Sequence, residues 1–169
     1  MYTAYLLLGS NLGNRELHLE KAKLLIRNHC GKIINQSSLY ETAAWGITTQ
    51  PSFYNQIIIL KTNLMPEVLM QSLLQIEETL GRIRTIKYGP RTIDIDIQLI
   101  DNITNNSQLL VLPHPFLSER RFALLPLSEV APNVVHPIFN KSISQLVLEC
   151  TDKLEVKKLV NVNNSTALC

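Results

Sequence analysis

The chain has 169 residues, of which 46% are hydrophobic and 18% charged, and its formal net charge is +2. This size and composition fit one globular domain and exclude a disordered tail protein. The small net charge gives no broad surface for nucleic acid or anionic membranes, and the first apolar run is too short for a signal peptide or a membrane span. The three cysteines include no CxxC pair, which argues against a disulfide framework or a thiolate metal site. We therefore expect a cytoplasmic protein that binds neither nucleic acid nor membranes.

The chain is expected to open with a strand and a helix. Residues 2–8 are apolar enough for a buried strand, and a run of turn-forming residues at 9–14 ends it. In the helix that follows, Asn14 is the expected cap, and Leu17, Leu24 and the stretch 21–26 are expected to form the apolar face.

Two strands, at residues 32–42 and 53–62, are expected to flank a loop at 43–52, and they could pair as a hairpin. This loop is long enough to have a function of its own. A second helix is expected to begin at Pro66, because proline fits the first turn of a helix and apolar residues then recur at helical spacing. Residues 93–100 form the clearest strand of the chain.

The rest of the chain predicts shorter elements. These are a strand within residues 109–112, a helix at 122–130 and a last helix capped by Ser142. The order strand, helix, strand, strand, helix, strand predicts an α+β fold with a ferredoxin-like βαββαβ core. We expect one domain over residues 1–150 and a C-terminal tail at 151–169 that is peripheral or flexible.

Two aspartates stand on the clearest strand. Because side chains alternate between the two faces of a strand, Asp94 and Asp96 share one face, with their Cα atoms roughly 6.5 to 7 Å apart. The apolar residues are expected on the other face: Ile93, Ile95, Ile97 and Leu99. Carboxylates at this separation suit Mg²⁺ ions that also bind phosphate oxygens and water. A solvated strand face is the alternative interpretation.

Four basic residues precede the two aspartates: Arg82, Arg84, Lys87 and Arg91. Acids and bases in this arrangement are typical of a metal–polyphosphate site, in which metals screen the acids and arginines bind the outer phosphates. A solvated charge cluster remains an alternative. The sequence has no Gly-x-x-x-x-Gly-Lys-Ser/Thr motif, so a P-loop is excluded.

Two other classes of protein stay open from the residues alone. A ferredoxin-like RNA-binding module would need basic and aromatic side chains on the sheet face, where this strand carries two acids. A regulatory domain without catalysis would have no need of the acids and the bases together.

These motifs resemble those of the 6-hydroxymethyl-7,8-dihydropterin pyrophosphokinase family of folate biosynthesis. The resemblance covers about residues 2–150, and its most specific block is Gly89-Pro90-Arg91-Thr92-Ile93-Asp94-Ile95-Asp96. The other matching segments include residues 5–13, 40–42, 53–55, 81–84, 111–115 and 120–132.

The resemblance implies a three-layer α/β sandwich around the ferredoxin-like core, with flexible catalytic loops near residues 11–16, 43–52 and 82–92. It also implies transfer of the β,γ-diphosphate of ATP to the pterin hydroxymethyl group, with release of AMP. ATP and the reduced pterin are then the partners of a monomeric enzyme, and two Mg²⁺ ions are its cofactors.

The resemblance further implies roles for individual residues. Asp94 and Asp96 would bind the two Mg²⁺ ions, and Arg82 and Arg91 would stabilise charge as the bridge between the α- and β-phosphates breaks. The remaining ATP-binding residues implied by the family are Glu77, Arg84, Tyr88, Ile97, His114 and Arg120. Read alone, His114 between two prolines could equally be a structural turn residue.

The implied pterin site combines aromatic stacking with hydrogen bonds. Phe53 and Phe122 would stack on the two sides of the ring, and Asn55 would bind its polar edge. Backbone groups would come from Thr42, Ala43 and Trp45. A lone phenylalanine is more often part of a core, so this assignment depends on the resemblance.

Overall fold

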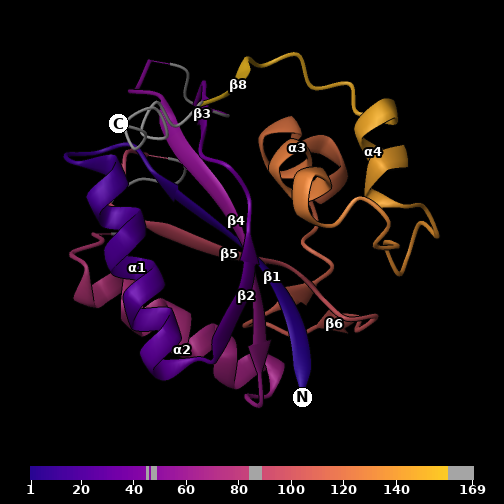
Figure 1. Ribbon diagram of the computed structural model, residues 1–169, viewed down its shortest axis with the longest axis horizontal. Coiled ribbons are helices and arrows are strands. Elements are labelled where there is room, and N and C mark those ends of the chain that lie inside the picture. Colours follow the sequence, from indigo (N-terminus) through magenta and orange to yellow (C-terminus); the bar gives the residue numbers. More distant parts are fainter. Residues whose placement is uncertain (45, 47–48, 84–88, 160–169) are drawn as a thin grey trace, which may run out of the picture.

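An antiparallel sheet lies between two layers of helices (Figure 1). The structure is a computed structural model that describes residues 1–44, 46, 49–83 and 89–159. The α+β fold with a ferredoxin-like core in three layers, predicted from the sequence, is therefore confirmed.

The sheet has six strands in the order β5-β1-β4-β3-β8, and β2 also pairs with β4. β1 is central and runs antiparallel to both β4 and β5. The strands are β1 (Tyr2–Ser10), β2 (Lys32–Gln36), β3 (Tyr40–Thr42), β4 (Phe53–Thr62), β5 (Asp94–Ile100) and β8 (Val156–Lys158). A separate two-stranded hairpin is formed by β6 (Asn105–Asn106) and β7 (Val111–Leu112).

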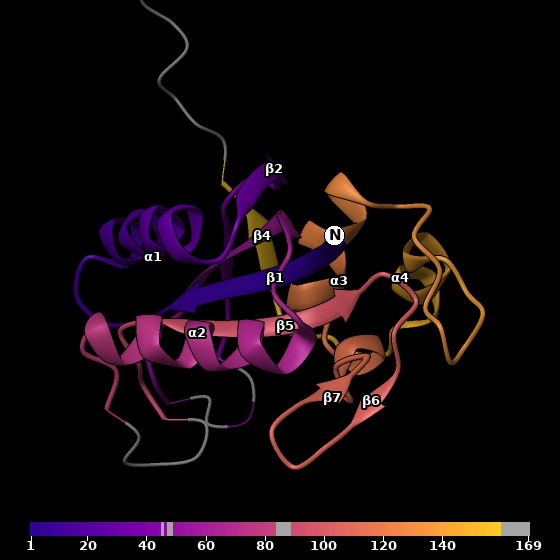
Figure 2. The same ribbon diagram turned by 90° about the horizontal axis from the view of Figure 1, so that it is seen from below.

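Helices α1 and α2 cover one face of the sheet, and α3 covers the other with α4 beside it (Figures 1 and 2). Each face has its own apolar cluster, so the sheet separates two cores. The helices are α1 (Arg15–His29), α2 (Pro66–Thr79), α3 (Arg121–Val130) and α4 (Ile143–Glu149), and a 3₁₀ turn η1 (Leu117–Glu119) precedes α3. No helix in the described part of the chain is long and apolar enough to cross a membrane.

The starts of α1 and α2 match the sequence. The Asn14 side chain accepts a hydrogen bond from the Leu17 backbone N–H at 3.0 Å, which confirms the predicted cap. Pro66 opens α2 as predicted. The predicted apolar face of α1 is correct only in part, because Ala22 and Ile26 of the 21–26 stretch are buried whereas Leu17 and Leu24 are 46% and 55% exposed.

The buried stripe of α1 contains a lysine. It consists of Leu19, Ala22, Lys23 and Ile26, a spacing that fits one face of a helix. The Lys23 ammonium donates to the side-chain oxygen of Gln56 at 3.1 Å. This hydrogen bond and the ion pair with Glu20 at 2.6 Å allow a charged residue to occupy a buried position.

The region 32–42 forms two strands rather than the one that was predicted. Ser37 lies between them and is buried, and its hydroxyl accepts from the Ile57 N–H at 3.0 Å while donating to the Ser38 carbonyl at 2.7 Å. A serine hydroxyl that bonds to the backbone competes with regular strand pairing. The chain therefore bends at Ser37, and β2 and β3 pair separately with β4.

A bulge in β5 changes the direction of its last side chains. Leu6 pairs with Ile97 and Tyr5 pairs with Leu99, so Gln98 is the extra residue. Leu99 consequently packs in the cluster on the α3 face, whereas Ile95 and Ile97 pack on the α1 and α2 face. The prediction that Leu99 shares a face with these isoleucines is wrong.

The chain beyond residue 150 returns to the sheet. β8 pairs antiparallel with β3, and Ala43 donates a backbone hydrogen bond to the Glu155 carbonyl at 3.2 Å. Ser142 caps α4 through a reciprocal hydrogen-bond pair with Gln145, as expected of a helix start. The domain boundary at residue 150 stays a prediction.

Candidate active site

One row of residues across three strands organises the site. In the register of the sheet, Gly9 of β1 lies opposite Asn55 of β4 on one side and opposite Asp94 of β5 on the other. Directly paired residues point to the same face of a sheet. The row therefore brings a predicted pterin residue and a predicted metal ligand to one surface, separated by a glycine.

Gly9 leaves the space between these two residues open. A Cβ atom at Gly9 would lie 2.7 Å from the Asn55 Oδ1 and 3.6 Å from the Phe53 ring. The first distance is too short for any side chain to be accepted without movement of Asn55. A residue without a side chain is thus required here by the close approach of the amide.

The Asp94 carboxylate is held by two arginines. Arg91 Nη1 lies 2.8 Å from its Oδ2, and Arg82 Nη1 bonds to its Oδ1. All three side chains are largely buried. Three of the predicted catalytic residues therefore meet in one ion-pair network.

Glu77 extends this network into the core. Its side chain is 2% exposed, and its Oε1 accepts from the Ile95 backbone N–H at 2.7 Å and pairs with Arg82. A buried carboxylate needs such partners. Glu77 thus fixes the end of α2 to the start of β5, next to Asp94.

Asp96 shares the face of Asp94, as predicted, and has a different environment. Its Oδ2 lies 3.9 Å from Arg120 Nη1, and the side chain keeps 32% of its surface exposed. Partial desolvation by the surrounding protein and the nearby Asp94 carboxylate raise the pKa of Asp96 above its usual range. A site that raises the pKa of a carboxyl in this way favours an added positive charge.

His114 and Arg120 form the far side of the charged region. Arg120 Nη1 is 3.4 Å from the His114 Nε2, and the His114 Nδ1 accepts from the Phe116 N–H at 3.1 Å. Burial and the Arg120 charge lower the pKa of His114 to about 4, so its ring is neutral at pH 7. The His114 backbone N–H also donates to the Gln98 carbonyl at 2.9 Å, which holds it beside β5.

The predicted pterin residues gather on the β3–β4 pair. Thr42 pairs with Phe53, and the Asn55 amide donates to the Thr42 Oγ1 at 2.7 Å. Phe53 and Asn55 are 9% and 4% exposed. This arrangement fixes the Asn55 amide with its Oδ1 over Gly9.

An arginine accompanies each of the two predicted stacking rings. The Arg91 Cζ lies 5.3 Å from the centre of the Phe53 ring, and the Arg120 Cζ lies 5.7 Å from that of Phe122 on α3. Both distances fall within the range of cation–π contacts. The two aromatic residues are thus each linked to the charged region by one guanidinium group.

Other predicted residues contribute less or cannot be placed. The Ile97 side chain packs in the core on the face opposite Asp96, so only its backbone can face the site. Ala43 is part of the described chain and bonds through its backbone to Glu155. Three predicted residues lie outside the described residues: Trp45, Arg84 and Tyr88.

Asn11 is a site residue that the sequence did not reveal. It is 2% exposed, its Oδ1 accepts from the Arg91 N–H at 2.8 Å, and its own backbone N–H donates to the Arg91 carbonyl at 3.2 Å. Its Nδ2 donates to Gln50 Oε1 at 3.0 Å and to the Pro51 carbonyl at 3.1 Å. One side chain thus joins the charged region to the end of the 43–52 loop. A turn-forming asparagine gives no signal of this, because its partners are far away in the sequence.

Comparisons with known proteins identify the family of the chain. Residues 5–132 match the model of the family described as 7,8-dihydro-6-hydroxymethylpterin-pyrophosphokinase (HPPK). The chain is 40% identical over 153 residues to the 2-amino-4-hydroxy-6-hydroxymethyldihydropteridine pyrophosphokinase of Aquifex aeolicus, covering 90% of this chain and 95% of that protein. It is 41% identical over 132 residues to the Bacillus subtilis protein of the same name, covering 78% of this chain and 79% of that one.

Solved structures extend the likeness of fold. The wild-type HPPK-DHPS of Plasmodium falciparum with STZ-DHP matches with a TM-score of 0.69 at 20% identity. The match covers 88% of this chain, which spans 43% of the length of that structure. The family match over most of the sequence and two relatives at about two-fifths identity confirm the resemblance read from the motifs. The chain belongs to the 7,8-dihydro-6-hydroxymethylpterin-pyrophosphokinase family.

Proposed function

We propose that the chain performs the reaction for which its family is named. It transfers the β,γ-diphosphate of ATP to the hydroxymethyl group of 6-hydroxymethyl-7,8-dihydropterin and releases AMP. The observation that supports this proposal is the row Asn55, Gly9 and Asp94, in which the residue predicted to bind the pterin lies one strand away from the residue predicted to bind metal.

Asp94 and Asp96 fit a magnesium site. They supply hard oxygen donors on one face of β5, and no group of three or more metal-binding side chains occurs within the part of the chain that the structure describes. Mg²⁺ in phosphate sites takes one or two carboxylates and completes its shell with phosphate oxygens and water. When bound, two Mg²⁺ ions would neutralise phosphate charge and lower the pKa of the attacking hydroxyl.

Arg82 and Arg91 would stabilise the triphosphate. Their guanidinium groups lie on the two oxygens of Asp94, so both arginines would be near a polyphosphate that binds beside this carboxylate. Charge-assisted bonds from arginine to phosphate are strong and directional. These residues are therefore suited to stabilise the charge that develops on the leaving AMP side, a task that requires positioning and needs no protein base.

His114 and Arg120 would bind the outer part of ATP. Arg120 stands between Asp96 and the neutral ring of His114, so it can reach a phosphate while the histidine offers an uncharged hydrogen-bonding group to phosphate or ribose. Glu77 and the backbone of Ile97 would support the nucleotide from the base of β5. We extend the same role to Arg84 and Tyr88 on the strength of the sequence resemblance.

The pterin would lie over Gly9. The Asn55 amide nitrogen is bonded to Thr42, and its Oδ1 lies over the glycine as an acceptor for ring N–H groups. Phe53 and Phe122 would stack on the ring, since flat heterocycles bind well between aromatic side chains. Backbone groups of Thr42, Ala43 and Trp45 would complete the hydrogen bonds. We propose a monomeric, cytoplasmic enzyme that needs only these small-molecule partners.

The products of the reaction test this proposal. Purified protein is incubated with ATP, Mg²⁺ and the reduced pterin, and nucleotides are separated by chromatography. AMP that forms only when the pterin is present, together with a pterin diphosphate, is the expected result. ADP in place of AMP would show transfer of a single phosphoryl group, and the absence of turnover with intact binding of ATP would indicate another acceptor.

A further inference from the structure

Arg15 occupies a position that local preference disfavours. It is the first residue of α1, immediately after the Asn14 cap. The N-terminus of a helix carries partial positive charge and favours acidic side chains over cations. A residue that breaks a local rule in this way is often explained by a contact elsewhere in the fold.

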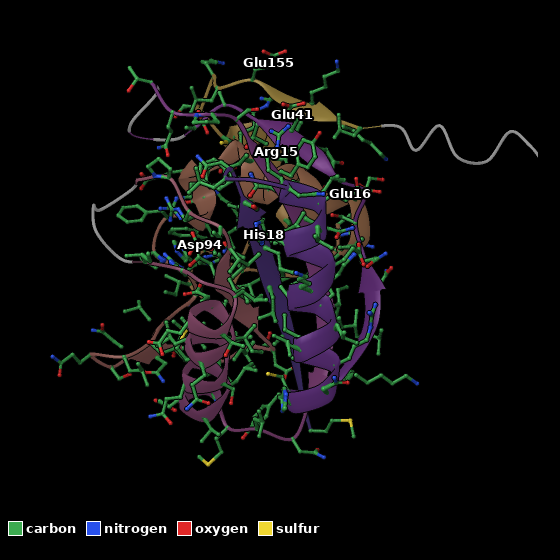
Figure 3. The ribbon with its side chains drawn as sticks, turned by 90° about the vertical axis from the view of Figure 1, so that its left-hand side faces the viewer. Arg15, Glu16, His18, Glu41, Asp94 and Glu155 are labelled. Atoms are coloured by element: carbon green, nitrogen blue, oxygen red, sulfur yellow. The ribbon has the colours of Figure 1, made fainter. Side chains whose placement is uncertain are left out.

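The side chain of Arg15 reaches the β3–β4 pair. Its Nη1 donates to the Ser52 carbonyl and to the Ser52 Oγ, both at 2.9 Å, and lies 3.2 Å from the Glu41 Oε1 (Figure 3). The Ser52 Oγ in turn donates to the Glu41 Oε1 at 2.6 Å. One guanidinium group therefore holds the residue that precedes Thr42 and the residue that precedes Phe53.

The guanidinium group also stacks on an aromatic ring. The Arg15 Cζ lies 3.7 Å from the centre of the Tyr54 ring, which is close contact. Tyr54 pairs directly with Glu41 across the two strands. An exposed ion pair alone contributes little to stability, but here the pair is joined to two further hydrogen bonds and a stacked ring.

These contacts lie on the reverse side of the predicted pterin residues. Glu41 and Tyr54 form one cross-strand pair, and Thr42 and Phe53 form the next. Because side chains alternate along a strand, the second pair points to the opposite face from the first. Arg15 thus contacts the β3–β4 pair from the α1 face, and the side chains of Thr42, Phe53 and Asn55 lie on the opposite face, toward the site.

We propose that Arg15 is a positioning residue for the pterin. By fixing the strand pair from behind, it keeps the Phe53 ring and the Thr42–Asn55 hydrogen bond in the geometry that receives the substrate. This inference rests on the proposed function. The Asp94 side of the site lies beyond β1 from this contact, so nucleotide binding is expected to be nearly independent of Arg15.

Steady-state kinetics of Arg15→Ala test the proposal, with KM measured separately for the pterin and for ATP. We expect KM for the pterin to rise about tenfold, while KM for ATP and kcat stay within about twofold of wild type. For Arg15→Lys, KM for the pterin should lie between the values for wild type and Arg15→Ala, because lysine keeps the charge and loses the planar stack. Arg27→Ala is the matched control, since it removes an exposed arginine near the other end of the same helix.

Glu41→Gln gives a second test that depends less on folding. It keeps the size of the side chain and removes the charge that faces Arg15, and we expect KM for the pterin to rise about threefold with KM for ATP unchanged. Variants that leave KM for the pterin at the wild-type value, or that raise both KM values equally, would overturn the role of Arg15. Wild-type protein that does not turn over the pterin at all would instead overturn the proposed function.

Discussion

The two halves of the site are built from different interactions. The half on β5 consists of charged groups that pair with one another, with Asp94 between Arg82 and Arg91 and with Asp96 near Arg120. The half on β3 and β4 consists of rings and a neutral hydrogen bond between Asn55 and Thr42. In the proposed reaction the charged half would exchange its ion pairs for phosphate and metal, whereas the neutral half would offer a ring and an amide group to the pterin.

This difference also separates what each half is expected to recognise. Ion pairs between arginine and carboxylate resemble the bonds that arginine makes to phosphate, so the charged half is matched to a polyphosphate. The neutral half is expected to select its ligand by the shape of the ring and by the placement of single donors and acceptors. Substitutions in the two halves should therefore affect different kinetic constants.

The largest expected effect comes from Asp96 in the charged half. Asp96→Asn keeps the size of the side chain and removes a charged ligand, and we expect kcat to fall by about a thousandfold or more with a native fold. Turnover and the circular dichroism spectrum check this. Activity close to wild type would show that Asp96 is not a metal ligand and would contradict the proposed contrast between the two halves.

His114 in the charged half makes stability depend on pH. The pKa of its ring is lowered to about 4 in the folded protein from 6.5, so the unfolded chain binds the proton more readily. The stabilisation is present above pH 6.5 and is lost as pH falls toward 4, by at most about 3 kcal/mol. Denaturant unfolding at a series of pH values measures this loss.

His114→Gln is the control for that dependence. The variant should show a shallower decline in the free energy of unfolding below pH 6.5, although His136 keeps a smaller contribution because burial lowers its pKa as well. An unchanged decline would mean that His114 is not buried as a neutral ring.

Asn11 joins the charged half to the loop that precedes β4, and its substitution tests this connection. Asn11→Asp keeps the oxygen that accepts from the Arg91 N–H and replaces the amide that donates to Gln50 and Pro51 by a carboxylate oxygen. Because two acceptors then face each other in a buried place, we expect a loss of about 1–3 kcal/mol in the free energy of unfolding. Chemical denaturation measures it.

The same substitution three residues away is the control. Asn14→Asp should leave stability nearly unchanged, because aspartate caps a helix as well as asparagine does. Equal losses in the two variants would show that the Asn11 amide has no special role in joining the loops.

The smallest of these effects is expected at Phe122 in the neutral half. Phe122→Ala removes one predicted stacking surface, and we expect KM for the pterin to rise about tenfold while KM for ATP changes less than about threefold. Phe139→Ala is the control, because it removes a half-exposed phenylalanine that lies outside α3. Equal changes in both KM values would place Phe122 in the core rather than in the pterin site.

The sequence predicted those features that depend on neighbouring residues. The bounds of β4, the cap at Asn14 and the shared face of Asp94 and Asp96 follow from local patterns, and the structure confirms them. The charge pattern of the sequence also predicted the grouping of Arg82 and Arg91 with the acids, and the family resemblance added roles in catalysis for the two arginines. Their roles in catalysis stay predictions.

The sequence failed where distant partners decide. The buried Lys23 donates a hydrogen bond to Gln56, and Leu99 changes face because a bulge at Gln98 shifts the register. Ser37 breaks a strand through a bond to Ile57, and Asn11 bonds to segments some 40 and 80 residues away. Patterns of hydrophobic residues carry no record of these long-range hydrogen bonds.

The most direct test of the two-part site is a crystal structure with Mg²⁺, a non-hydrolysable ATP analogue and the pterin. We predict metal density between Asp94, Asp96 and the phosphates, arginine contacts transferred from Asp94 to phosphate, and the pterin over Gly9 beside Asn55. Metal bound away from both aspartates, or a pterin that binds outside the β3–β4 pair, would contradict the account.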